Sequence, residues 1–214
     1  MCDAAAVARV VRIAEVEPFA GEVRWHPLRY ALGVNGFGVN AFSGDAGDRV
    51  IEEHDELGAA AAGHDELYVV IGGRATFTVD GEEIDAPAGT LVQVEPESRR
   101  TAFAVDDETY VLVIGATPGE PFTPSPWEVS SQAALYALRG DADKSRAALA
   151  EALREHGDHP HVLYNAACAE ALLGEREAAL EHLIAAVAGE PKAREWAAKD
   201  SDLDSLRDDP AFPV

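Results

Sequence analysis

The sequence predicts an α+β protein with two domains: an antiparallel β-barrel domain over residues 1–125, followed by an all-α domain over residues 126–214. Three observations support this prediction. The first domain holds short alternating runs rich in Val, Thr and Phe, with turn residues between them. The second holds Ala-, Leu- and Glu-rich stretches with helical spacing. The segment TPGEPFTPSPWE between them carries four prolines, which is typical of a linker or an extended strap.

The strands of the first domain are expected in RWHPLRYALGVNGFGVNAF, ELYVVIG, RATFTVDGEEIDA, TLVQVEP, RRTAFAV and TYVLVIG. Within TVDGEEI, the pair Asp80-Gly81 supplies the positive φ that a tight hairpin turn needs. Several short strands separated by turns indicate a sandwich or barrel and not a parallel α/β sheet.

The second domain carries an internal repeat. Gly140 and Gly174 lie in the similar contexts LRGD and LLGE, and their spacing equals the tetratricopeptide period of about 34 residues. The domain therefore resembles a short tetratricopeptide array, with a final segment similar to the cap of such arrays. Two repeats are fewer than the roughly three that stability usually needs, so we expect them to dock on the barrel or on a second subunit. The residues that match the repeat pattern are Tyr164, Asn165, Gly174, Ala179, Leu183, Ala186 and Pro191.

Composition excludes some classes of partner. Hydrophobic residues make up 47% of the chain, too many for a disordered protein. The formal net charge is −22, a field that repels phosphate backbones and anionic lipid, so neither nucleic acid nor a membrane surface is an expected partner.

The cysteines and the N-terminus favour a cytoplasmic protein. Cys2 and Cys168 lie far apart in the sequence, and a disulfide between them is not expected. The N-terminal segment is interrupted by Arg9, Arg12 and Glu15, so it matches neither a signal peptide nor a spanning helix.

The stretch GHDELYVVIGGRATFTVDGEEIDAPAGTLVQVEPESRRTAFA resembles the cupin superfamily, over roughly residues 45–115. Glu66 and Gly73 match the glutamate and glycine of the first cupin motif, and Gly89 with Pro96 opens the second. The resemblance implies a jelly-roll barrel that binds a small molecule and pairs as a homodimer. The usual ligand motif is altered, because Thr101 occupies the slot of the second-motif histidine and alanines occupy the slots of the first-motif pair.

The tetrad HDEL occurs twice in EEHDELGAAAAGHDELYVV, and it suggests a replacement for the missing ligands. Side chains alternate along a strand, so His54 and Glu56 share one face, as do His64 and Glu66 on the next strand. If both faces point inward, two imidazoles and two carboxylates meet. This mixed N/O set suits a divalent Mn, Fe, Ni, Co or Zn ion.

Three further residues are predicted to contact a substrate: Tyr68, Arg99 and Thr101. Tyr68 shares strand parity with Glu66, and Arg99 shares parity with Thr101, so both are expected to face the barrel interior. Arg100 is then expected to be solvated. No catalytic residue can be named from the sequence.

Two functions stay open. In the first, a modified metal site at His54, Glu56, His64 and Glu66 supports an oxygenase, isomerase or lyase step on a small molecule. In the second, a non-catalytic cupin acts as a ligand sensor or scaffold, and the helical repeats bind a protein partner or a second copy of the chain.

Overall fold

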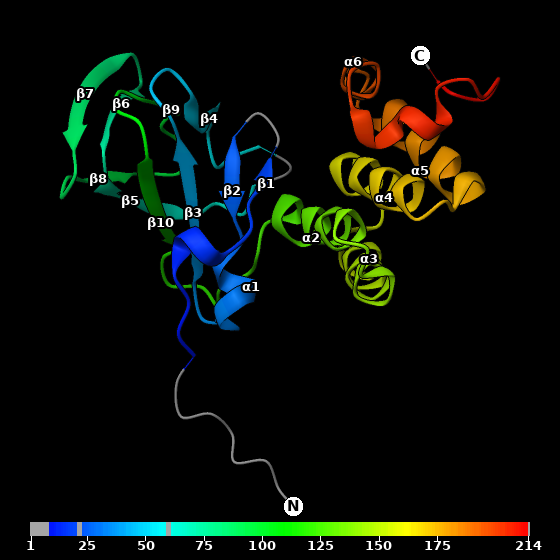
Figure 1. Ribbon diagram of the computed structural model, residues 1–214, viewed down its shortest axis with the longest axis horizontal. Coiled ribbons are helices and arrows are strands. Elements are labelled where there is room, and N and C mark those ends of the chain that lie inside the picture. The colour runs from blue at the N-terminus through cyan, green and yellow to red at the C-terminus, as the bar shows by residue number, and fades with distance from the viewer. Residues whose placement is uncertain (1–8, 21–22, 59–60, 214) are drawn as a thin grey trace, which may run out of the picture. The chain divides into compact units, whose positions relative to one another are not determined.

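The computed structural model describes residues 9–20, 23–58 and 61–213. Cys2, and with it the expectation about a disulfide, lies outside the described residues. The chain divides into two compact units, a β-unit that ends at Thr123 and a helical unit that begins at Pro124 (Figure 1). In the described part of the chain, no helix is both long and apolar enough to cross a membrane.

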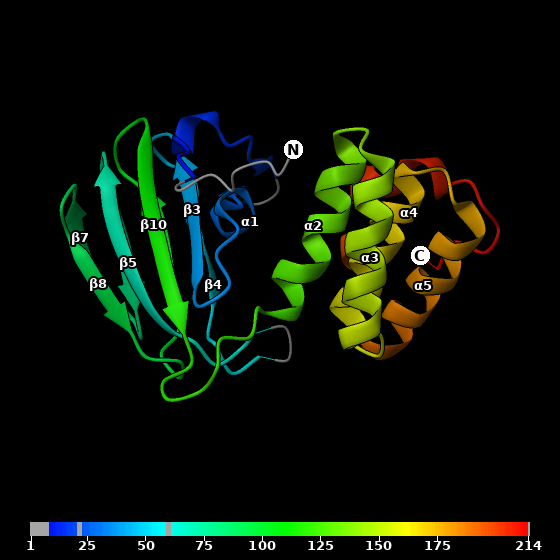
Figure 2. The same ribbon diagram turned by 90° about the horizontal axis from the view of Figure 1, so that it is seen from below.

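The β-unit, over the residues that the structure describes, has ten antiparallel strands in two sheets. Figure 2 shows β3, β10, β5 and β8 side by side in the larger one. Its six strands, in spatial order, are β1 (Phe19–Ala20), β2 (Arg24–His26), β3 (Gly38–Gly44), β10 (Thr109–Ala116), β5 (Asp65–Gly72) and β8 (Leu91–Val94). The smaller sheet has the order β4 (Arg49–His54), β9 (Arg100–Ala104), β6 (Arg74–Val79) and β7 (Glu82–Pro87).

The antiparallel strands and the helices fit the predicted α+β class, but the two sheets stay open where a closed barrel was predicted. At Gly73 the chain leaves β5 in the larger sheet and enters β6 in the smaller. Gly73 has a φ of +63°, a left-handed conformation that ends the strand, so no continuous strand bends round this corner.

The core of the β-unit combines large and small side chains. Tyr68 and Phe77 pack edge to face, with ring centroids 5.4 Å apart, and both are almost completely buried. Ala102 and Ala104 on β9 are also buried, and their small side chains leave room for the large rings.

The hairpin predicted at Asp80-Gly81 is confirmed. Both residues have positive φ, 49° and 88°, and the flanking residues Val79 and Glu82 pair directly. The first segment differs from the prediction, because a short helix, α1 (Leu28–Leu32), interrupts the expected strands between β2 and β3. Before β1 lies a single 3-10 turn, η1 (Ile13–Glu15).

The helical unit contains two helical pairs and a short closing segment. Its elements are α2 (Pro126–Leu138), α3 (Ala142–His156), α4 (Pro160–Leu172), α5 (Arg176–Gly189), α6 (Ala193–Ala197) and the 3-10 helix η2 (Ser201–Leu206). The first two helices begin at side-chain caps: Ser125 accepts a hydrogen bond from the Glu128 N–H, and Asp141 from the Lys144 N–H.

The two helical pairs turn in the same way at the two glycines of the sequence repeat. Gly140 and Gly174 have φ of 74° and 77°. The N–H of each donates to the carbonyl of an alanine in the preceding helical turn, at 2.9 and 3.1 Å. Ser145 and Ala179, which are separated by the same period as the glycines, are both fully buried, and this lets the helices of each pair approach closely.

The close approach at Gly73 gives a stability prediction. A Cβ at this position would lie 2.4 Å from Thr109 Oγ1 and 2.8 Å from Thr109 Cα, so a buried backbone would have to shift. We expect Gly73→Ala to lower the free energy of unfolding by about 3 kcal/mol, measured by urea denaturation. Gly81→Ala is the control, because its φ is also positive but its Cβ would meet nothing within 4 Å, and about 1 kcal/mol is expected. Equal losses would contradict the steric explanation.

The core of the helical unit gives a second prediction. Leu183 on α5 is fully buried among the side chains of α4, α5 and η2, whereas its neighbour Ile184 is 46% exposed. We expect Leu183→Ala to cost about 3 kcal/mol of unfolding free energy, because it leaves a cavity. Ile184→Ala should cost less than about 1 kcal/mol. Far-UV circular dichroism during denaturation measures both, and a cost at Ile184 as large as that at Leu183 would refute the assignment of the buried face.

Candidate functional site

Three side chains of types that can bind a metal meet where β4 ends and β5 begins. His54 ends β4, Glu56 lies in the turn that follows, and Glu66 lies on β5. The His54 Nε2 atom is 3.7 Å from Glu56 Oε1 and also 3.7 Å from Glu66 Oε2. One donor atom from each of the three side chains lies within 4.8 Å of the others. We call these three residues the HEE cluster.

A hydrogen bond to the backbone fixes the orientation of the His54 ring. Its Nδ1 atom lies 2.8 Å from the Glu52 carbonyl oxygen, so the tautomer with a proton on Nδ1 donates to that carbonyl. The Nε2 atom is then left to face the two carboxylates. The His54 side chain is about one-third exposed (35%), whereas those of Glu56 and Glu66 are 10% and 13% exposed, so solvent reaches the cluster from the His54 side.

The loop between the two HDEL tetrads holds Glu56 in place. The backbone N–H groups of Ala62 and His64 both donate to Glu56 Oε2, each at 3.3 Å. The Glu56 N–H donates to the Pro96 carbonyl, and the Gly63 N–H donates to the Glu56 carbonyl. The chain from Ala62 to His64 therefore supplies hydrogen-bond donors to this carboxylate.

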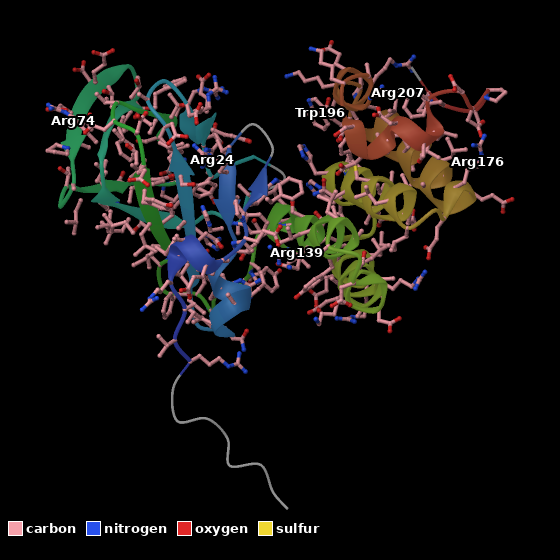
Figure 3. The ribbon with its side chains drawn as sticks, viewed as in Figure 1. Arg24, Arg74, Arg139, Arg176, Trp196 and Arg207 are labelled. Atoms are coloured by element: carbon pink, nitrogen blue, oxygen red, sulfur yellow. The ribbon has the colours of Figure 1, made fainter. Side chains whose placement is uncertain are left out.

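Glu66 is contacted by two further buried side chains. The Tyr68 hydroxyl donates to Glu66 Oε2, and Arg100 Nη2 lies 3.2 Å from the same oxygen. Arg100 is fully buried on β9, and its Nη1 atom donates to the Ser98 carbonyl at 2.9 Å. In contrast, the arginines Arg24 and Arg74, labelled in Figure 3, pair with carboxylates at the surface.

The cluster shifts the pKa of its members. Burial disfavours the charged form of His54, but the hydrogen bond and charge of Glu66 outweigh this effect, and the pKa of His54 is raised above 6.5. Burial likewise disfavours the Glu66 carboxylate, yet His54, Tyr68 and Arg100 together lower its pKa below 4.5. Burial and the Glu66 charge raise the pKa of Tyr68 well above 10, so the phenol keeps its proton.

His64 lies apart from the HEE cluster. It precedes β5, which begins at Asp65, so strand alternation does not extend to its side chain. Its ring stacks on Phe122 at 5.2 Å between centroids, and its Nε2 atom lies 3.0 Å from the Thr123 carbonyl oxygen. Only the backbone N–H of His64 contributes to the cluster, through Glu56.

The two adjacent arginines are placed opposite to expectation. Arg100, expected in solvent, pairs with His54 across β4 and β9 and faces the interior, as Ala102 and Ala104 do. Arg99 precedes β9 and is 57% exposed, where its Nε atom lies 2.7 Å from Glu53 Oε1. The expectation came from Thr101, because its place in the slot of the second-motif histidine assigned its face, which Arg99 shares, to the interior.

Thr101 also lies on the face of β9 opposite to the one predicted. It lies on the opposite parity from Arg100, and its hydroxyl donates to the Ile51 carbonyl at 2.8 Å within the smaller sheet. The structure therefore brings Tyr68 to the cluster and leaves Arg99 and Thr101 away from it. The signal for Arg100 was the Ala102 and Ala104 alternation, since small residues on a strand can mark the face that packs against large rings.

A second group of ligand-type side chains lies in the helical unit: Cys168, Asp200 and Asp202. Asp200 caps η2 by accepting a hydrogen bond from the Asp202 N–H, and the Tyr164 hydroxyl donates to it at 2.8 Å. Burial raises the pKa of the Cys168 thiol well above 9, and burial with neighbouring carboxylates raises the pKa of Asp202 to about 6. The thiol therefore keeps its proton, and the Asp200 carboxylate is engaged by the η2 cap and by Tyr164.

The chain matches no known family model and no curated protein. Among solved structures, it is similar to a cupin protein from Bacteroides fragilis, with 23% identity and a TM-score of 0.42 over 55% of this chain and 92% of that one. A predicted oxalate decarboxylase from Thermotoga maritima has 19% identity and a TM-score of 0.40, over 50% and 96%. An RmlC-like cupin protein from Desulfovibrio desulfuricans has 23% identity and a TM-score of 0.35, over 54% and 96%.

The His54–Glu66 pair should give stability a definite pH dependence. The raised pKa of His54 means that its contribution is complete below 6.5 and is lost as pH rises through its folded pKa. The lowered pKa of Glu66 means that its contribution is present above 4.5 and is lost as pH falls through its folded pKa. The contribution of the pair should therefore be greatest between these two values.

Urea denaturation with chelator present measures this effect. At about pH 5.5, His54→Gln should cost about 1 kcal/mol or less, since solvent screens a ring that is one-third exposed. At about pH 8.5 that cost should shrink. Glu53→Gln, which changes an exposed pair with Arg99, is the control and should leave the stability difference between the two pH values as in the wild type. A His54→Gln cost that grows with pH would contradict the assigned direction.

Proposed function

We propose that the β-unit binds a small molecule in the manner of a cupin, at a divalent metal ion held by His54, Glu56 and Glu66. The single observation that carries this proposal is the distance of 3.7 Å from the His54 Nε2 atom to a carboxylate oxygen of each glutamate. Metal–ligand bonds of about 2.1 Å allow two donors on one ion to lie up to about 4.2 Å apart. These distances are therefore compatible with one shared ion.

The surroundings of the donors fit a metal as well as the distances do. Metal-bound histidines usually donate their second ring N–H to a carbonyl or carboxylate, and His54 does so to Glu52. One imidazole and two carboxylates suit Mn, Fe, Ni, Co or Zn. Three protein donors also leave coordination positions for a ligand, as catalytic sites require.

At such a site, the bound ion and the residues of the chain would have different roles. A bound ion would supply Lewis acidity and a template for a polar ligand, a chemistry that oxygenase, isomerase and lyase reactions can use. Tyr68 and Arg100 hold the Glu66 carboxylate in position, and the loop amides hold Glu56. A small molecule would enter over the His54 ring, which is the most exposed of the three donor side chains.

A second candidate function belongs to the helical unit. The matching turns at Gly140 and Gly174 favour a tetratricopeptide-like pair of repeats, and such repeats commonly bind peptide segments. In this alternative the β-unit is a non-catalytic sensor or scaffold, and the helices bind a protein partner or a second copy of the chain. A chain that holds no metal would leave this alternative as the better one.

Metal analysis of protein purified without chelator tests the first proposal. We expect the wild type to carry up to about one equivalent of a transition metal, and His54→Ala or Glu66→Gln to weaken its binding at least about tenfold, as each removes a ligand. Glu53→Gln is the matched control, because it changes a glutamate one residue from His54 that pairs with Arg99 on the outside. A wild type with less than about 0.1 equivalent, and with no rise in melting temperature when Mn, Fe, Ni, Co or Zn is added, would refute the metal site.

A further inference from the structure

Arg100 leaves one edge of its guanidinium without hydrogen bonds. The side chain is fully buried, and its Nε and Nη2 atoms make no hydrogen bond to any residue that the structure describes. These two nitrogens form one edge of the planar group, the fork that binds a carboxylate through two parallel hydrogen bonds. An unsatisfied buried donor is costly, so this edge needs a partner.

The carboxylate beside this edge is Glu66. Its Oε2 atom lies 3.2 Å from Arg100 Nη2, which makes an ion pair without the alignment of a hydrogen bond. The same oxygen accepts the Tyr68 hydroxyl proton and faces the His54 ring at 3.7 Å. Glu66 therefore lies between two positions for a cation: the Arg100 fork on one side and the centre of the HEE cluster on the other.

Charge makes these two positions compete. The cluster holds two carboxylates, and Arg100 is the buried cation that neutralises one of them. A divalent ion bound to Glu66 would lie within several ångströms of the guanidinium, where like charges repel strongly in a partly desolvated site. Full engagement of Glu66 by the Arg100 fork would turn the same carboxylate away from an ion.

We propose that Arg100 is a built-in counter-cation that competes with the metal ion for Glu66, so that metal loading exchanges one cation for another. This inference rests on the proposed metal site. It adds what determines how fully that site is occupied by a metal ion. Without an ion, the Glu66 carboxylate stays paired with Arg100. Metal binding weakens the Arg100–Glu66 pair, and the affinity of the site is lower than its three ligands alone would give.

Metal titration of three arginine variants tests this exchange. Arg100→Gln keeps a polar side chain but removes the charge, and we expect it to bind Mn²⁺ or Zn²⁺ at least about tenfold more tightly than the wild type. It should also melt at a lower temperature in chelator and gain more from added metal. Arg100→Lys keeps the charge and should stay closer to the wild type. Arg99→Gln is the matched control, since it removes the same charge from the neighbouring exposed position and should leave the affinity within about threefold.

A measurement on the wild type tests the exchange without comparing metal affinities between variants. The Nε–H resonance of buried Arg100, assigned by its loss in Arg100→Lys, should shift on titration with diamagnetic Zn²⁺, because its carboxylate partner moves. An Nε–H resonance that is unchanged at saturation with Zn²⁺ would overturn the exchange. The titration needs neither substrate nor activity.

The outcomes separate this inference from the proposed function. Wild type that binds metal, with Arg100→Gln no tighter, would overturn the counter-cation role and leave the metal site standing. Wild type that binds no metal, with Arg100→Gln binding it, would support the counter-cation role and refute a loaded wild-type site. Absence of metal binding in all the variants would refute both.

Discussion

The site depends on one buried carboxylate and on the cations and donors that surround it. Glu66 lies on β5 in a core otherwise formed by apolar side chains, where an unpaired charge would be very unfavourable. His54, Tyr68 and Arg100 converge on its Oε2 atom from neighbouring positions in the two sheets. The order of the strands around this point therefore places a compact polar cluster inside the β-unit, and the chemistry of the unit follows from it.

Backbone amides stabilise the rest of the cluster. Glu56 lies beyond the end of β4, where no strand partner fixes its side chain, and the chain from Ala62 to His64 returns to donate two N–H groups to it. A loop of small residues can approach a carboxylate in this way because it carries no bulky side chains of its own. The segment from Ala62 to His64 is thus also the part of the chain that orients one of the candidate ligands.

Strand alternation explains both what the sequence could predict and what it could not. It correctly placed Glu66 and Tyr68, two positions apart on β5, on one face, whereas His54 and Glu56 meet although Glu56 lies in the turn beyond β4. It failed at His64, which lies just before β5 begins. It also failed at Arg99 and Arg100, where the interior face of β9 carries alanines and the outer face carries larger apolar residues. Side chains do alternate along each strand, but deciding which face of β9 points inward required knowing which side chains of the other sheet lie opposite that face.

The two ligand-type groups among the described residues show two ways to bury carboxylates. In the helical unit, the Tyr164 hydroxyl and the Cys168 thiol donate to Asp200, and burial with neighbouring carboxylates raises the pKa of Asp202 to about 6, with no cation beside them in the group. In the β-unit, Arg100 supplies a fixed positive charge, and the pKa of Glu66 is lowered instead. A thiol must lose its proton to bind a metal, and the pKa of Cys168 is raised well above 9, whereas the lowered pKa of Glu66 leaves that carboxylate ionised. This difference in protonation makes the cluster of the β-unit the better candidate for ligand chemistry.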